Sequence, residues 1–209
     1  GNIGYSFSYA LSKKDYDYVV LEVSSFQLDN IIDFKPFISV LLNITPDHLD
    51  RYKGDFSKYI NAKHKITLNQ NHNDYIIYNY DDESVRSIKT QAKKIPISLF
   101  STLKDDAGFY KNNKISINLN NSKMTINKLA LQGKHNIFNS MAAAMAARVF
   151  EVSDDLIRQS LIDFENVEHR LEYVLKVHGI DFINDSKATN VNAAWYAVES
   201  MTKPFVWIV

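Results

Sequence analysis

The sequence predicts an α/β fold with a mostly parallel sheet flanked by helices. Two segments, YDYVVLEV at residues 16–23 and FISVLLNIT at 37–45, are apolar and β-branched almost throughout. Continuous apolar runs of this kind are typical of parallel strands that helices cover on both faces. Helical patterns alternate with further strands along the rest of the chain, and this alternation indicates a parallel sheet.

Four elements follow in order after the second strand. DFSKYINAKHKITL at 55–68 has an Asp placed to cap a helix and apolar residues spaced along one face. DYIIYN at 74–79 predicts another buried strand, and DDESVRSIKTQAKK at 81–94 predicts a helix with acids in its first turn. IPISLFS at 95–101 predicts a further strand.

The pattern changes between residues 105 and 132. Short alternating segments separated by Asn-rich turns predict a small antiparallel hairpin region at the margin of the sheet. An Ala-rich helix at 133–150 and an N-capped amphipathic helix at 153–164 follow.

The α/β pattern restarts near the C-terminus. LEYVLKVHGIDFIND at 171–185 predicts a strand pair that turns at His178-Gly179, followed by a helix at about 190–200 and a last strand in KPFVWIV. We therefore expect a domain boundary near 167–170, with one domain over 1–168 and the beginning of a second over 169–209.

Composition narrows the choice of partners and compartment. Lys plus Arg equals Asp plus Glu at 24 each, and no basic stripe interleaved with aromatics is visible, so nucleic acid is not expected as a partner. The sequence has no Cys, which agrees with a cytoplasmic protein and leaves oxygen or imidazole as metal ligands. No apolar run reaches the roughly 18 residues of a membrane helix, so no membrane insertion is expected.

Polar residues follow three predicted strands. Ligands of open parallel sheets bind beyond the carboxyl ends of the strands, where loops and helix N-termini converge. The candidates are Glu22, Ser24, Ser25 and Gln27 after the first strand, Asn43, Thr45, Asp47 and His48 after the second, and Asp185, Ser186, Lys187 and Thr189 after the strand beyond the boundary.

Two of these residues allow a structural as well as a functional interpretation. Glu22 is suited to coordinate a hard cation such as Mg²⁺, which takes one or two carboxylates. It is equally suited to cap the following turn. His48 lies in TPDHLDRY, where Asp47, Asp50 and Arg51 can hold one another by ion pairs, and a histidine that simply bonds a neighbouring carboxylate is the more ordinary interpretation.

Lys63 stands out in its helix because it shares the inward apolar stripe with Phe56 and Tyr59. An ammonium there is costly unless it is paired or extends outward to water, and extension is the ordinary explanation. The functional explanation is that a desolvated, partly neutral lysine reacts with carbon dioxide to form a carbamate, an anion that can bind metal.

Two amides lie on one face in the first turns of the Ala-rich helix. Asn136 and Asn139 are three residues apart, and their side chains can donate to and accept from a base edge. Helix capping is the alternative role.

Seven stretches, in the same order along the chain, resemble the Mur ligase family. They are GNIG at 1–4, LEVSSFQLD at 21–29, LNITPDHLDRY at 42–52, AKHKI at 62–66, GKHNIFNSMAAA at 133–144, HRLE at 169–172 and NDSKATN at 184–190. The resemblance implies the central ATPase-type domain of this family, followed by the first βα unit of a Rossmann-like C-terminal domain. DSKATN resembles the branch of the family that adds D-glutamate.

The resemblance implies an ATP-dependent acid–amino-acid ligase of peptidoglycan precursor synthesis. In this family ATP phosphorylates a carboxylate, here that of UDP-N-acetylmuramoyl-L-alanine, and the amine of D-glutamate attacks the acyl phosphate. The reaction requires charge neutralisation at the phosphoryl group and the oxyanion, which two Mg²⁺ ions and fixed cations supply.

The resemblance also implies roles for individual residues. Glu22 would bind one Mg²⁺, and His48 with carbamylated Lys63 would serve the second. His48, Lys63 and Lys187 would be catalytic, and His48 would also contact the substrate. The remaining contacts would be Asn2 and Ser24 to the muropeptide nucleotide, Asn136 and Asn139 to the adenine, Arg170 and Asp185 to the phosphates and ribose, Lys187 to phosphate or carbamate, and Thr189 to D-glutamate.

The chain also departs from the family pattern. It contains no Gly-Lys-Thr or Gly-Lys-Ser phosphate loop, and no counterpart of the N-terminal domain or of most of the C-terminal domain. We therefore expect a fragment that does not turn over ATP alone, from a protein that acts as a monomer. A nucleotide-binding or partner-binding module without catalysis, or a sister ligase for another amino acid, are the alternatives.

Overall fold

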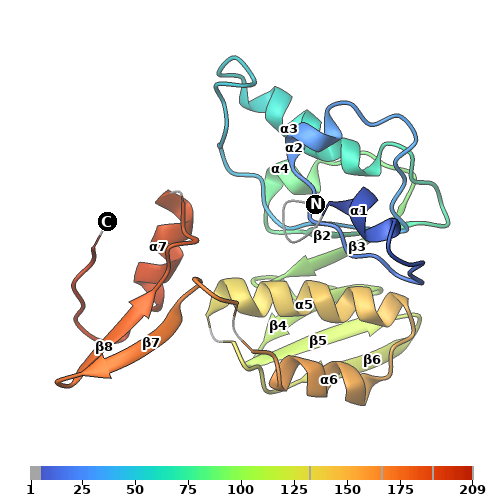
Figure 1. The fold of residues 1–209 in the computed structure, drawn as a ribbon. Helices are drawn as coiled ribbons and strands as arrows, with labels where there is room; N and C mark the ends of the chain where they lie inside the picture. The colour runs from blue at the N-terminus through green and yellow to red at the C-terminus, as the bar shows by residue number, and fades with distance from the viewer. Residues whose placement is uncertain (1–5, 132, 166, 190, 209) are drawn as a thin grey trace.

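The computed structural model describes residues 6–131, 133–165, 167–189 and 191–208 (Figure 1). A six-stranded sheet runs in the order β1 to β6, and β7 and β8 form a separate pair. The strands are β1 (Ile38–Leu41), β2 (Tyr75–Asn79), β3 (Lys93–Ser98), β4 (Ala107–Lys111), β5 (Lys114–Leu119), β6 (Ser122–Ile126), β7 (Glu172–Val177) and β8 (Ile180–Asn184).

The predicted fold class is confirmed. β1 to β4 pair in parallel, whereas β4, β5 and β6 pair antiparallel as the expected hairpin region. The helices are α1 (Phe7–Leu11), α2 (Ser25–Leu28), α3 (Phe56–His64) with a 3₁₀ turn at Lys65–Thr67, α4 (Glu83–Arg86), α5 (Lys134–Val149), α6 (Asp154–Ile162) and α7 (Val191–Ser200).

Helices cover both faces of the sheet. In Figure 1, α5 crosses one face of the hairpin region, and α2, α3 and α4 lie together at the other end of the molecule. Ile77 of β2 packs in the core that includes α5, while its neighbour Ile76 packs with α3, and both are 0% exposed. Burial of successive residues explains why this strand is apolar without alternation.

A glycine allows α5 to approach the sheet closely. A Cβ at Gly108 of β4 would lie 2.9 Å from Ile97 Cγ2 and 3.0 Å from Met141 Cγ. Met141 is 0% exposed, so it has little room to move. The absence of a side chain at Gly108 therefore sets the distance between α5 and β4.

Two consecutive carboxylates tie the carboxyl ends of the first three strands together. Asp82 accepts hydrogen bonds from the Val85 and Ile44 N–H groups at 3.0 Å each, so it caps α4 and holds the loop after β1. Asp81 accepts from Ser98 Oγ at 2.6 Å and from Leu99 N–H at 2.7 Å, at the end of β3.

Two predicted strands are absent from the described residues. Residues 16–23 have no strand partner, and Val20 is 99% exposed. Residues 203–208 likewise form no strand, and Ile208 is 87% exposed. Apolar, β-branched sequence is not sufficient for a strand, because the backbone also needs a neighbour with which to bond.

Two further predictions were right in type but wrong in length. The strand predicted over 37–45 is only Ile38–Leu41. The helix predicted over 81–94 is only α4, because Lys93 and Lys94 enter β3 opposite Tyr75 and Ile76. Between α4 and β3, Ile88 is buried at 2% exposure, so the chain turns inward instead of continuing as a surface helix.

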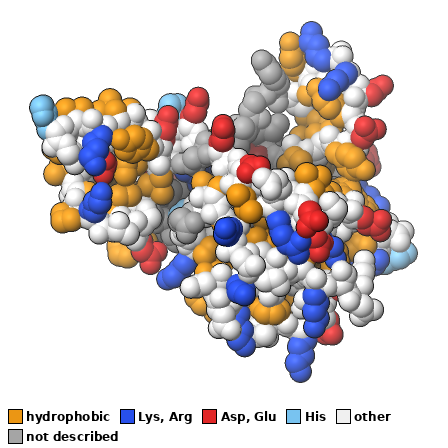
Figure 2. All heavy atoms as spheres, turned by 90° about the horizontal axis from the view of Figure 1, so that it is seen from below, with side chains coloured by type: hydrophobic (Ala, Val, Ile, Leu, Met, Phe, Trp, Pro, Cys, Tyr) orange, Lys and Arg blue, Asp and Glu red, His pale blue; other side chains and the backbone are white. Residues whose placement is uncertain are grey.

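The C-terminal segment forms the predicted strand pair. β7 and β8 are antiparallel, and the turn between them has positive φ at His178 (49°) and Gly179 (83°), as the tightest hairpin turns require. Many apolar side chains of this unit are exposed, and Figure 2 shows them gathered at its surface, on the left. None of the helices in the described ranges is long and apolar enough to cross a membrane.

We predict that Gly108→Ala destabilises the chain by about 1–3 kcal/mol, because the added methyl group overpacks the contact with α5. Urea denaturation of the 209-residue chain measures the change. The double variant Gly108→Ala/Met141→Ala should lose less stability than the sum of the losses of the two single variants, because Met141→Ala removes one of the clashing side chains. Full additivity would contradict the close contact.

Candidate functional site

Lys63 lies in the last turn of α3, within electrostatic reach of two carboxylates. Its side chain is partly buried, and this burial lowers its pKa from the usual value. The carboxylates of Glu22 and Asp47 oppose the change and raise the pKa, so the structure brings both within electrostatic reach of the ammonium. Lys63 Nζ also lies 5.1 Å from the centre of the Tyr59 ring.

This environment suits both interpretations of Lys63. The ammonium has carboxylates and a ring face as partners, as in an ordinary cation that reaches out of the core. The lowered pKa also increases the neutral fraction of the amine, which is the form that reacts with carbon dioxide. The environment of Lys63 is therefore compatible with both the amine and the carbamate.

His48 lies one residue beyond Asp47 on the loop after β1. Its backbone is left-handed (φ 50°), its N–H donates to Asp47 Oδ1 at 2.9 Å, and its Nδ1 is 3.8 Å from the same oxygen. Its ring packs edge-on against Phe26 with the centroids 5.1 Å apart. Asp47 therefore contacts His48 and also acts electrostatically on Lys63.

The ion pair predicted within this loop is replaced by a longer-range one. Arg51 Nε pairs with Asp29 Oδ2 at 3.5 Å, and Tyr52 Oη donates to the same oxygen at 3.2 Å. The guanidinium of Arg51 also lies 4.6 Å from the centre of the Phe26 ring. Asp29 follows α2, so these contacts attach the loop after β1 to that helix, which the local sequence spacing did not indicate.

Ser24 completes a capping box at the start of α2. Its hydroxyl accepts from Gln27 N–H at 3.3 Å, and the Gln27 side chain accepts from Ser24 N–H at 2.9 Å. These contacts fix the chain immediately after Glu22. Ser24 therefore has a structural role in addition to the substrate contact suggested for it.

The donors near Lys63 fit a hard divalent cation. Within the ranges that the structure describes, no three His, Cys, Asp or Glu side chains are grouped as a metal site. The carboxylates of Glu22 and Asp47 are nevertheless of the type that could bind such an ion, because Mg²⁺ commonly takes only one or two carboxylates, with water and substrate phosphate in its other positions. A carbamate on Lys63 would add a further oxygen anion.

A second polar cluster joins the start of α5 to the C-terminal unit. Burial lowers the pKa of His135 and the charge of Arg170 lowers it further, whereas Asp185 and Glu199 raise it. Lys134 Nζ lies 3.8 Å from the carboxylate of Glu199 in α7. The structure thus brings Arg170 and Asp185 to the helix that carries Asn136 and Asn139.

The other predicted site residues are placed as follows. Lys187 and Thr189 lie exposed in the segment after β8, and the Lys187 N–H donates to His169 O at 3.0 Å. Asn136 is partly buried and Asn139 is exposed on α5. Asn2 lies outside the described residues.

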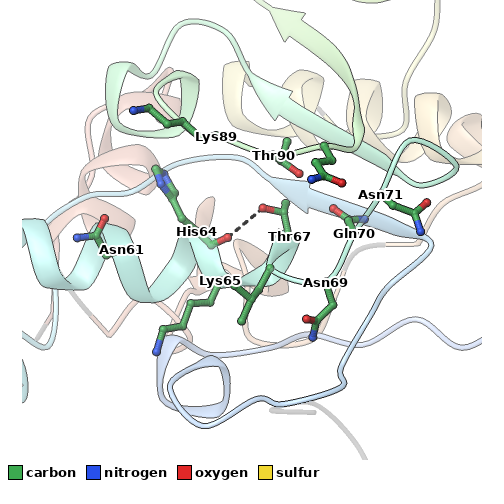
Figure 3. Close-up of a pocket in the computed structure, with 11 residues that line it drawn as sticks. Asn61, His64, Lys65, Thr67, Asn69, Gln70, Asn71, Lys89 and Thr90 are labelled. Carbon is green, nitrogen blue, oxygen red and sulfur yellow. Dashed lines mark hydrogen bonds between the residues drawn. The ribbon is translucent and has the colours of Figure 1, made fainter.

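A separate depression of about 750 Å³ is lined by none of the predicted site residues. It opens at the amino ends of β2 and β3, and Figure 3 shows Lys65 and Lys89 extending from opposite sides of it. Gln70 donates to Pro36 O at 2.9 Å and Tyr75 O at 3.0 Å, and Asn69 donates to Ile32 O at 2.6 Å. These amides hold the surrounding loops, so we assign no ligand to this depression.

Comparison with known proteins identifies the family of the chain. The description "Mur ligase middle domain" matches residues 2–147. The protein of Salinibacter ruber named "UDP-N-acetylmuramoylalanine--D-glutamate ligase" is 50% identical over 218 aligned positions, which cover 100% of this chain and 47% of that protein. The protein of the same name from Christiangramia forsetii is 46% identical and is covered to 48%. The chain thus spans about half the length of these relatives.

Solved structures of related proteins share the fold. MurF from Acinetobacter baumannii aligns with a TM-score of 0.64 at 20% identity, covering 79% of this chain and 37% of that chain. A pseudomurein peptide ligase type C from Methanothermus fervidus aligns with a TM-score of 0.61 at 21% identity, covering 79% and 41%. MurF ligase from Thermotoga maritima, solved in complex with ADP, aligns with a TM-score of 0.59 at 20% identity, covering 79% and 39%.

We predict that Lys63→Met stabilises the chain at pH 7 by roughly 0.5–1 kcal/mol, because it removes a cation whose burial is unfavourable. A lysine with a lowered pKa loses its proton more readily in the folded chain than in the unfolded chain. The buried ammonium therefore lowers the free energy of unfolding by its full amount below the folded-state pKa. The cost disappears as the pH rises from that pKa toward the usual 10.5. Urea denaturation at pH 7 and pH 10 should show the advantage of the variant shrinking.

The matched control for this prediction is Lys58→Met on the same helix. The Lys58 side chain is 58% exposed and pairs with Asp55 at 3.5 Å. Its replacement should leave stability unchanged or slightly reduced, because a solvated surface pair contributes little. Equal gains from both substitutions would show that burial of Lys63 is not the cause.

Proposed function

The chain belongs to the Mur ligase family, and we propose that the protein that carries it is an ATP-dependent ligase adding D-glutamate to UDP-N-acetylmuramoyl-L-alanine. The observation that carries the proposal is the position of Lys63, partly buried and within electrostatic reach of the carboxylates of Glu22 and Asp47. Similarity along the whole chain to proteins named for this reaction supports the choice of amino acid.

The proposed reaction has two steps. The γ-phosphoryl group of ATP is transferred to the substrate carboxylate, giving an acyl phosphate and ADP. The amine of D-glutamate then attacks the acyl carbon, an amide bond forms, inorganic phosphate leaves and the amine loses a proton. Both steps develop negative charge on oxygens in a confined space, so fixed positive charges must be held where it develops.

The cluster around Lys63 would bind Mg²⁺ in this scheme. Glu22 with Asp47, and His48 with a carbamylated Lys63, would hold two ions, which would neutralise the phosphate and acyl-phosphate oxygens. The capping box at Ser24 and the contacts of Arg51 with Asp29 would keep the two loops of this cluster in place. Ser24 and Asn2 would lie on the side of the muropeptide nucleotide.

The second cluster would bind the other reactants. Asn136 and Asn139 on α5 would contact the adenine, while Arg170 and Asp185 would reach the phosphates and ribose. Lys187 would lie beside phosphate or carbamate, and Thr189 beside the carboxylate of D-glutamate. This scheme assigns 1–168 to a central ATP-binding domain and 169–209 to the start of a C-terminal domain, in a monomeric cytoplasmic enzyme.

We predict that the full-length gene product uses D-glutamate in preference to other acceptors, because its segment 184–190 resembles the branch of the family that adds D-glutamate. The measurement is release of inorganic phosphate with UDP-N-acetylmuramoyl-L-alanine, ATP and Mg²⁺, comparing D-glutamate, L-lysine, meso-diaminopimelate and L-alanine. Preference for another amino acid would make the protein a sister ligase. ATP binding without turnover of any acceptor would favour a binding module.

We predict that Lys63→Ala lowers the turnover number of the full-length protein by about 100-fold or more, the order expected when a group acting on developing charge is removed. If the carbamate is the active form, formate or acetate should restore part of the activity by replacing its carboxylate. The control is Lys58→Ala, which should retain activity. Activity of Lys63→Ala equal to that of the wild type would remove this residue from the mechanism.

A further inference from the structure

The turn that carries Arg170 has an unusual backbone. The residues on either side of it, His169 (φ 64°) and Leu171 (φ 46°), are both left-handed. This conformation is unfavourable for residues with a Cβ, and two instances around one residue require the surroundings to hold them in place. What holds the turn therefore also decides the direction in which Arg170 leaves the backbone.

Backbone hydrogen bonds attach this turn to the ends of β7 and β8. His169 N–H donates to Glu172 Oε2 at 2.8 Å, and Leu171 N–H donates to Asp185 Oδ1 at 3.0 Å. The carbonyl oxygen of His169 accepts from Lys187 N–H at 3.0 Å. Carboxylates accept backbone N–H groups more strongly than neutral acceptors do, so Glu172 and Asp185 offset part of the strain.

The side chains of the same segment form a second layer of contacts. Glu172 and Asn184 face each other as partners in the β7–β8 pair. Asn184 Nδ2 lies 3.3 Å from Glu172 Oε2 and 2.9 Å from His169 Nδ1, and that nitrogen is 3.3 Å from Glu172 Oε2. Glu172 thus contacts the turn through both the backbone and the ring of His169.

Arg170 lies within electrostatic reach of α5. Its charge lowers the pKa of His135 at the start of that helix. Glu172 is the carboxylate two residues along the chain, yet its Oε2 accepts from the backbone of the turn. The contact of Glu172 therefore acts on the backbone that carries Arg170.

We infer that Glu172 and Asn184 are positioning residues for Arg170: they hold the left-handed turn so that the guanidinium faces the start of α5 and can meet a phosphate of a bound nucleoside triphosphate. The inference rests on the proposed function, because the anion that Arg170 would meet is supplied by ATP. Glu172 and Asn184 do not contact the nucleotide in this arrangement.

The test is a set of variants in the full-length gene product, with the KM for ATP, the turnover number and the equilibrium binding of ATP as readouts. Glu172→Ala should raise the KM for ATP by about 10-fold or more, since a displaced contact costs binding and orientation. Glu172→Gln retains an oxygen that can accept the His169 N–H, so it should restore most of the loss. Glu168→Ala, an exposed acid beside the turn, is the matched control and should leave KM unchanged.

The decisive comparison is made in an Arg170→Ala background. If Glu172 acts through Arg170, adding Glu172→Ala should raise the KM no further, because the group that it positions is gone. An undiminished effect of Glu172→Ala in that background would overturn the inference. If Glu172→Ala does not fold, the same comparison with Asn184→Ala decides it. A wild-type protein that binds no ATP would overturn the proposed function and this inference together, whereas ATP binding with additive effects overturns the inference alone.

Discussion

The loops of the candidate site depend on two consecutive carboxylates, Asp81 and Asp82, at the end of β2. Loops that leave the same edge of a parallel sheet have backbone N–H groups without strand partners. Asp82 accepts from Ile44, on the way to Asp47, and Asp81 accepts from Leu99 after β3. Hydrogen bonds to a charged acceptor contribute roughly 1.5–3 kcal/mol each, so this pair stabilises the edge while fixing the loop that carries His48.

Elements with a complete local signal were predicted from the sequence. The helix α3 has its capping Asp55 and an apolar stripe, and the β7–β8 turn has His178 and Gly179 at the positions that need positive φ. Residues 16–23 and 203–208 have the composition of strands but no partner strand in the described residues. Strand formation is a property of a pair, so composition alone could not decide it.

In the candidate site too, some contacts were predictable from the sequence and others were not. The rule that polar residues meet at the carboxyl edge of a parallel sheet brought Glu22 and Asp47 into consideration. Both lie within electrostatic reach of Lys63, although the strand predicted before Glu22 does not form. The contact between Arg51 and Asp29 joins residues 22 positions apart, and no spacing in the sequence indicates it. Asp81 and Asp82 were interpreted as helix-start acids, which describes the cap of α4 but not the bonds to neighbouring strand ends.

The way α5 is anchored has a mechanical consequence. Met141 and Met145 are 0% exposed against the sheet, while His135 at the beginning of the same helix lies within electrostatic reach of Arg170. A helix packed this tightly over most of its length moves with the sheet as one body. Any reorientation of the β7–β8 unit must then be absorbed by the chain between α6 and β7. The helix α5 would then be the fixed element against which the unit bearing Arg170 and Lys187 reorients.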